Sequence, residues 1–179
     1  YGSFNGNIKE IVSQAGIVYS RTVDPTNRYD LPGDFMEWRP TCHHKDKNIM
    51  EKTDIFLGMR LPEAKLYLVW GHSYEFDEDK NWEVIEEVCK KLSGKQDIWY
   101  ATCIEVYEYM TAYQRLEFSF NCTSVKNPSA TAVWLSVNSK PVKIMPGETV
   151  CLASPKKKNV ANAPTPAAKD ANASAKSAN

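Results

Sequence analysis

The sequence lacks the charge imbalance, the long hydrophobic runs and the cysteine spacing that mark several large classes of protein. Its 22 basic residues balance 22 acidic ones, so the overall charge favours neither nucleic acid nor an anionic membrane as a partner. No apolar run approaches the roughly 20 residues of a membrane-spanning helix. The five cysteines show no Cys-x-x-Cys spacing, which argues against a zinc ribbon and a dense disulfide framework. We therefore expect neither a nucleic-acid partner nor a membrane span.

The sequence does contain enough apolar side chain for one sizeable core, because 42% of its 179 residues are hydrophobic and 11% are aromatic. Residues 154–179 are the exception. They are rich in Ala, Lys, Asn, Ser and Pro and lack large apolar residues. A segment of this composition cannot bury enough apolar surface to fold, so it is predicted to be a disordered tail of low complexity.

Apolar periodicity predicts an α/β fold in which strands alternate with helices over residues 1–116. Helices are expected over 5–16, 46–59, 82–92 and a segment that begins at Thr102, and strands over 17–23, 66–70 and 97–101. Such alternation is typical of βα units around a parallel sheet. From 117 to 153 the pattern changes to short strand-like runs separated by Asn-Pro-Ser and Pro-Gly turns, which predicts a small antiparallel β extension.

His72 is the first residue that could carry chemistry, because it follows the predicted strand over 66–70. Folds built of βα units place reactive side chains at the carboxyl ends of their strands. An imidazole can also donate or accept a proton near neutral pH. The alternative is a loop histidine that only hydrogen-bonds its neighbours, and the position of His72 alone does not separate the two.

Asp34, Glu37 and Trp38 place two carboxylates beside an indole large enough to form one wall of a sugar site. A carboxylate near a histidine favours its protonated form and so makes it a better acid. The competing interpretation is a polar loop with a packed tryptophan.

A second polar group consists of Cys42, His43, His44 and Asp46, all residue types that bind zinc. Neighbouring side chains in an extended segment point to opposite sides, so His43 and His44 are not expected to share one ion. A role in loop structure or substrate contact is therefore the favoured interpretation, and a metal site is the alternative.

Three motifs in this order resemble those of the polysaccharide deacetylases with a NodB-homology domain, carbohydrate esterase family four. Tyr1-Gly-Ser-Phe-Asn is similar to the end of the family's Arg-x-Pro-Tyr motif. Asp34-Phe-Met-Glu-Trp38 resembles its Asp-x-x-Asp-Trp motif, with Glu37 in place of the second aspartate. Leu66-Tyr-Leu-Val-Trp-Gly-His72 resembles its last motif, a strand that leads to a catalytic histidine. The resemblance covers about residues 1 to 116.

The resemblance implies the C-terminal part of a distorted (β/α) barrel and a set of site residues. His72 would protonate the leaving amine, Asp34 would tune His72, and the backbone N–H of Tyr1 would hold the oxyanion. The substrate-binding residues implied are Trp38, Leu68 in the acetyl pocket, and the sugar-stacking Trp70 and Tyr74. The family's divalent metal, usually zinc, is held by an aspartate and two histidines of motifs that this sequence lacks. The resemblance therefore implies that this chain holds no catalytic metal.

Two functional hypotheses follow from the resemblance. The chain is either part of a longer enzyme that removes N-acetyl groups from an N-acetylglucosamine-containing polysaccharide, or a truncated paralogue. In the second case it would be a non-catalytic carbohydrate-binding or structural remnant with Trp38, Trp70 and Tyr74 as a sugar platform. The polysaccharide substrate favours an extracellular or cell-envelope location.

Overall fold

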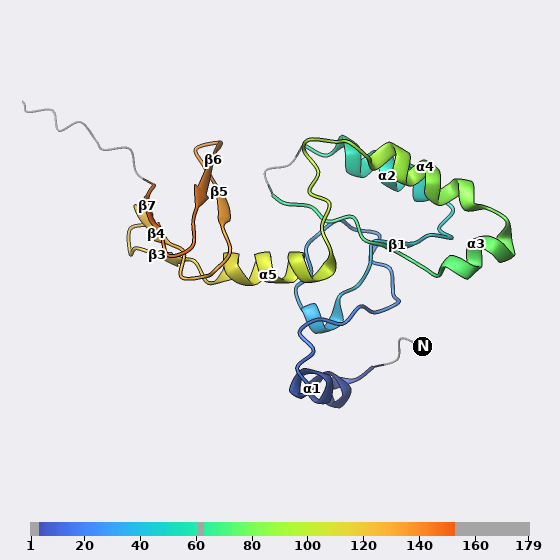
Figure 1. The fold of residues 1–179 in the computed structure, drawn as a ribbon, viewed down its shortest axis with the longest axis horizontal. Helices are drawn as coiled ribbons and strands as arrows, with labels where there is room; N and C mark the ends of the chain where they lie inside the picture. Colours follow the sequence, from blue (N-terminus) through green and yellow to red (C-terminus); the bar gives the residue numbers. More distant parts are fainter. Residues whose placement is uncertain (1–3, 61–62, 153–179) are drawn as a thin grey trace, which may run out of the picture.

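The computed structural model describes residues 4–60 and 63–152 (Figure 1). Tyr1 and the predicted tail over 154–179 lie outside the described residues. The helices are α1 (Gly6–Gln14), the short 3-10 helix η1 (Phe35–Glu37), α2 (Ile49–Gly58), α3 (Ser73–Asp79), α4 (Trp82–Leu92) and α5 (Cys103–Gln114). The strands are β1 (Cys42–His43), β2 (Val69–Trp70), β3 (Glu117–Phe118), β4 (Ser124–Lys126), β5 (Val133–Val137), β6 (Lys140–Ile144) and β7 (Thr149–Cys151).

A small parallel layer lies at the centre of the N-terminal region. Strands β1 and β2 pair in parallel, with Cys42 opposite Val69. A third segment, around Arg21, pairs in parallel with the chain that leads into β1, through a bridge between Arg21 and Trp38. The expected strand over 17–23 is reduced to this bridge, and 97–101 forms no strand. The sheets of the described residues are small and form no closed barrel, so the (β/α) barrel remains a prediction.

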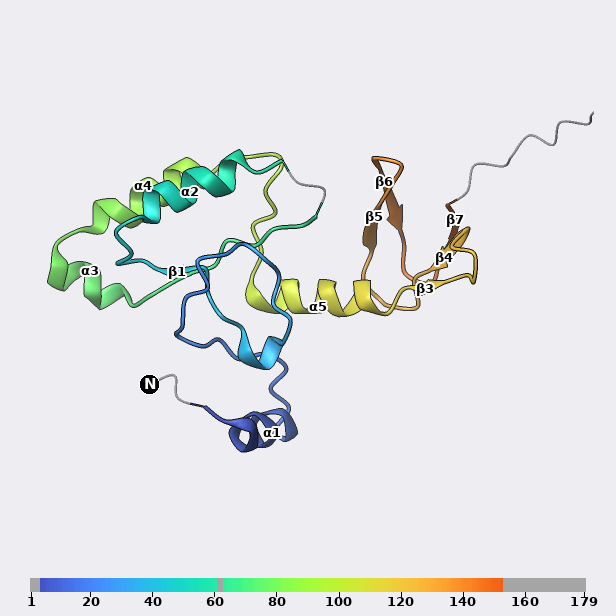
Figure 2. The same ribbon diagram turned by 180° about the vertical axis from the view of Figure 1, so that it is seen from behind.

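Helices α2 and α4 cover one side of this layer and lie side by side in both ribbon views (Figures 1 and 2). Their contact forms the core: Cys42 of β1, Ile49 of α2 and Val88 of α4 are each at most 3% exposed. The half-buried side chains that surround these three are Met50, Tyr67, Val69, Val84, Ile85 and Leu92. The expected helix over 82–92 is confirmed with the same bounds, because its apolar residues recur at helical spacing toward this core.

Helix ends follow the capping signals of the sequence. The Asn5 side chain accepts a hydrogen bond from the Ile8 N–H and begins α1. Thr102 and Glu105, three residues apart, form a capping box that begins α5 at the expected place, so both predicted helices are confirmed. Helix α3 was not predicted, because its seven residues bury only Phe76 and show too little apolar periodicity.

The C-terminal region, 117–152, is joined to the first by α5 (Figure 2). Strands β3, β4 and β7 form an antiparallel sheet, and β5 and β6 form an antiparallel hairpin beside it. Its buried side chains are Val125, Val133 and Ile144, together with the polar Asn127. No helix among residues 4–60 and 63–152 is long and apolar enough to cross a membrane.

Candidate functional site

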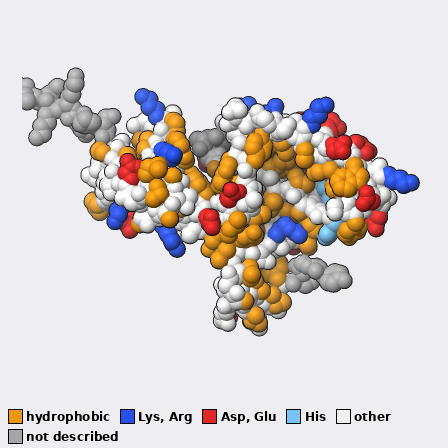
Figure 3. All heavy atoms as spheres, in the orientation of Figure 1, with side chains coloured by type: hydrophobic (Ala, Val, Ile, Leu, Met, Phe, Trp, Pro, Cys, Tyr) orange, Lys and Arg blue, Asp and Glu red, His pale blue; other side chains and the backbone are white. Residues whose placement is uncertain are grey.

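All three histidines of the chain meet at one carboxylate, that of Glu75. His43 ends β1, His44 follows it, and His72 comes two residues after β2. Because β1 and β2 are parallel, their carboxyl ends lie at the same edge, which brings the three imidazoles together. Histidine side chains reach the molecular surface near α3, beside acidic and hydrophobic side chains (Figure 3).

The start of α3 places Glu75 in this cluster. His72 is the N-cap of the helix, and Glu75, three residues later, reaches back to accept the His72 backbone N–H at 2.9 Å. The same oxygen, Oε2, lies 3.1 Å from His72 Nδ1. A capping-box contact therefore fixes the carboxylate against the imidazole.

His44 and His43 approach the same oxygen from the other strand. Nε2 of His44 lies 2.9 Å from Glu75 Oε2, and Nε2 of His43 lies 3.4 Å from it. The His44 side chain is only 2% exposed, and its ring packs on Phe76 with 4.1 Å between the ring centroids. Its Nδ1 is buried without a hydrogen-bond partner among the described residues.

Gly71 makes room for the His44 ring. A Cβ atom at position 71 would lie 1.7 Å from Cδ2 of His44, far inside any real contact distance. The backbone of Gly71 therefore forms the floor on which the buried imidazole rests, and a larger residue would displace it.

The expectation that His43 and His44 point apart is wrong. Strand β1 ends at His43, and a turn follows in which the Asp46 N–H donates to the His43 carbonyl. His44 is thus in a turn and not in an extended segment, and the alternation of side chains no longer applies. The two ring centroids are 4.4 Å apart.

The Glu75 carboxylate is ionised near neutral pH. Hydrogen bonds from His44 and from the His72 N–H lower the pKa of Glu75 to about 2, although its partial burial opposes the shift. Burial and then the neighbouring His44 lower the pKa of His43, so this imidazole favours its neutral form. Lys45 contacts the other oxygen, Oε1, at 3.4 Å.

The predicted partner of His72, Asp34, has other contacts. Its carboxylate pairs with Lys9 and also accepts the Met36 N–H at the start of η1. Glu37 pairs with the same lysine at 3.3 Å. Among the described residues, the carboxylate that contacts His72 is that of Glu75.

Trp38, the predicted sugar-site wall, lies inside the N-terminal region. It is 1% exposed and packs edge-on against Phe35 and Tyr19, with ring centroids 5.3 and 5.9 Å away. Neither face of the Trp38 ring is therefore open to a ligand.

The other predicted substrate residues stay close to His72. Tyr74 is 54% exposed, with its ring centroid 5.3 Å from that of His72. Trp70 is half-buried, lies edge-on to His72 at 5.8 Å, and carries the Arg21 guanidinium 4.3 Å above its ring. Leu68 is half-buried immediately before β2. Its carbonyl accepts the Thr41 N–H at 2.8 Å.

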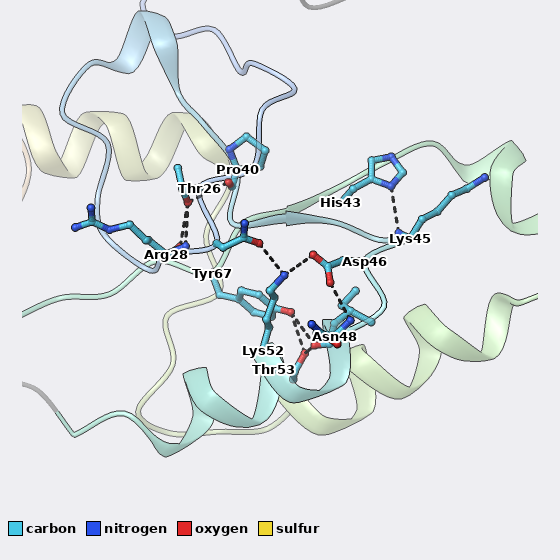
Figure 4. A network of polar contacts seen from close by, with 12 residues as sticks. Thr26, Arg28, Pro40, His43, Lys45, Asp46, Asn48, Lys52, Thr53 and Tyr67 are labelled. Carbon is cyan, nitrogen blue, oxygen red and sulfur yellow. Dashed lines mark hydrogen bonds and ion pairs between the residues drawn. The ribbon is translucent and has the colours of Figure 1, made fainter.

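Cys42 and Asp46 do not join the histidines that flank them in sequence. Cys42 belongs to the hydrophobic core, where burial raises the pKa of its thiol. Asp46 pairs with Lys52 and points away from the His43 ring (Figure 4). The four-residue group predicted as an alternative metal site is therefore divided by the turn.

Sequence reasoning missed Glu75, although a signal was present. Glu75 follows His72 by three residues, the same capping-box spacing that Thr102 and Glu105 show at the start of α5. The cluster can hold a proton or a cation between its imidazoles and carboxylate.

A scan of protein-family models and searches of the curated proteins and of the solved structures gave no significant match to this chain.

Proposed function

We propose that this chain forms the acid-bearing side of the active site of a polysaccharide deacetylase, a metal-dependent hydrolase of N-acetyl groups in an N-acetylglucosamine-containing polysaccharide. The observation that supports this proposal is the setting of His72. Its side chain is 50% exposed at the carboxyl end of β2, and a carboxylate holds one of its two ring nitrogens. A histidine in this setting is oriented, accessible and able to donate a proton.

The residues of this chain do not fit the family's catalytic metal. The sequence has no Thr-Phe-Asp-Asp segment and no His-x-x-x-His segment, so its usual ligands and base are missing here. Only the step in which the amine leaves can be argued from these residues.

In that step Glu75 orients His72 and His72 acts as the acid. The contact between Nδ1 and Oε2 keeps a proton on Nδ1, which leaves Nε2 to face the substrate. Nε2–H of the imidazolium donates its proton to the amide nitrogen as the bond from carbon to nitrogen breaks. The sugar amine then departs neutral, and the imidazole is left neutral. Tyr74 and Trp70 would border the sugar on either side of the acid.

The test measures acetate release from chitin oligomers by the gene product that contains this chain. His72→Ala should lower kcat by about 10²–10⁴-fold, the usual contribution of general acid catalysis. Glu75→Gln should lower kcat less and change its pH profile, because a positioning residue acts through the imidazole. Glu78→Gln, an exposed carboxylate on the same helix, is the matched control and should leave kcat unchanged. A folded His72→Ala enzyme with near-normal kcat would contradict the proposal.

The exposure of Tyr74 beside Trp70 also fits the second candidate, a carbohydrate-binding remnant. That candidate predicts binding of chitin oligomers without any acetate release. Titration of the oligomers, followed by tryptophan fluorescence in wild type and in Tyr74→Ala, separates the two functions.

A further inference from the structure

His43, His44 and Glu75 have the composition and the spacing of a transition-metal site. One ligand atom from each lies within 4.8 Å of the other two. A tetrahedral zinc ion with bonds of 2.0–2.1 Å holds its ligand atoms about 3.3–3.4 Å apart. The distances from Glu75 Oε2 to Nε2 of His43 and of His44 are 3.4 and 2.9 Å, which is close to that spacing.

We propose that these three side chains bind one zinc-like divalent metal ion. Two imidazoles and one carboxylate are a common ligand set for zinc, and three protein ligands leave a position for water. The inference does not depend on the proposed deacetylase function. It also differs from the metal implied by the resemblance, whose ligand motifs this sequence lacks.

The burial and charge of the cluster favour a cation over a proton alone. The His44 side chain is 2% exposed, and its one hydrogen bond to the described residues is made by Nε2, the nitrogen that would bind the metal. Glu75 supplies a fixed negative charge through an oxygen on which three ring nitrogens converge. Lys45 contacts Oε1 at 3.4 Å and is itself paired with Asp79 at 2.7 Å.

Metal binding at Nε2 requires both His43 and His44 to hold their remaining proton on Nδ1, and the change at His43 provides a specific signature. The Lys45 backbone N–H now donates to Nδ1 of His43 at 3.1 Å, so the proton of the neutral ring sits on Nε2. A metal at Nε2 moves the remaining proton to Nδ1 and ends this bond. The Lys45 N–H lies on the exposed side and can bond to water instead.

The experiment titrates the 179-residue chain with zinc chloride and follows both heat and the histidine nitrogens by NMR. We expect one ion per chain, a change of the His43 proton from Nε2 to Nδ1, and a shift of the Lys45 amide signal. Glu75→Gln, which keeps the size of the side chain, and His43→Gln should both abolish one-to-one binding. Asp79→Asn, a neighbouring carboxylate outside the ligand set, should retain it.

His72→Gln separates a ligand from a neighbour. Loss of a neighbouring group costs about 10–100-fold in metal affinity, whereas loss of a ligand costs more, so this variant should keep one-to-one stoichiometry. Circular dichroism shows that each variant is folded. Absence of zinc binding by the wild-type chain would overturn the proposal. Binding that persists in folded Glu75→Gln, with unchanged histidine signals, would assign the ion to cysteine thiols and overturn it as well.

Discussion

Each of the two regions of the molecule buries one strongly polar side chain, and the two are satisfied very differently. In the C-terminal region Asn127 is fully buried. Its amide nitrogen donates to the carbonyls of Thr131 and Ile144, and its oxygen accepts from the N–H and the hydroxyl of Ser129. In the N-terminal region His44 is equally hidden, but one of its nitrogens has no partner and the other shares an oxygen with two more histidines.

The comparison separates a structural polar group from a functional one. An Asn side chain has two donors and two acceptor positions, and all four are used in the fold of the extension. Such a group specifies the geometry of a turn and has nothing left for a ligand. The buried His44 imidazole keeps Nδ1 without a partner among the described residues, and we interpret this, together with the crowding at Glu75 Oε2, as a mark of the proposed site.

The largest effect on stability is expected at Asn127, the buried side chain that makes all of its hydrogen bonds. Asn127→Ala removes four hydrogen bonds, two to the carbonyls of Thr131 and Ile144 and two from Ser129, so we expect a loss of about 3 kcal/mol in the free energy of unfolding. In a chain of this size that corresponds to a fall of roughly 6–12 °C in Tm. Asn121→Ala, at an exposed asparagine of the same region, should change Tm by much less. Equal shifts in the two variants would break the comparison.

In the N-terminal region, Gly71→Ala should remove the proposed zinc site and also destabilise the fold. Its Cβ would overlap the His44 ring, and overpacking of this kind costs about 1–3 kcal/mol. Zinc titration should show no one-to-one binding in this variant. Gly33→Ala is the control, because a Cβ at position 33 meets no atom within 4 Å. A Gly71→Ala chain with normal zinc affinity would show that His44 is not a ligand.

A smaller effect is expected at Tyr67, whose hydroxyl is hydrogen-bonded within the N-terminal core. The Tyr67 hydroxyl lies 2.9 Å from the buried Thr53 hydroxyl and 3.3 Å from the Ile49 carbonyl, and burial raises its pKa (Figure 4). Tyr67→Phe should cost about 1 kcal/mol in a urea melt, without effect on zinc binding. Tyr113→Phe, at an exposed tyrosine, should be close to neutral.

The smallest effect concerns the ion pair that ties α1 to η1. Lys9 lowers the pKa of Asp34 below its usual value, so the pair stabilises the fold above the pKa of the unfolded carboxyl, about 3.9. This contribution is lost as the pH falls through the lower folded pKa. Asp34→Asn keeps the acceptor for the Met36 N–H, so only the charge is tested.

Melts of the wild type and Asp34→Asn should therefore differ slightly at pH 7 and converge in acid. They should also converge at high salt, because Asp34 is exposed and Lys9 is only half-buried, so the pair is screened. A difference that grows as the pH falls would contradict this prediction, because the ion pair would then stabilise the fold more in acid than at pH 7.

Local signals explain why much of the fold could be predicted. The helix over 82–92 presents apolar residues at a regular spacing, and the Thr102 capping box lies within four residues of sequence. Strands are harder, because their hydrogen bonds come from distant segments. The apolar run over 97–101 reads as a strand, yet no neighbouring segment pairs with it among the described residues.

His72 itself could be identified from the sequence, because its position after an apolar run depends only on residues next to it. Its carboxylate could not. The Asp34 motif pointed to one partner, but the backbone places Asp34 beside Lys9, and the first turn of α3 brings Glu75 to the imidazole instead.

The sequence by itself determined helices α1, α2, α4 and α5 and the candidate histidines, because these depend on spacing along the chain. Only the tertiary structure decided which of those residues meet. A turn after β1 brings His43 and His44 to one side, parallel pairing brings His72 to the same edge, and Gly71 leaves room for a buried ring. These are contacts between segments about 30 residues apart, and no local pattern of residues encodes the approach of two such segments in space.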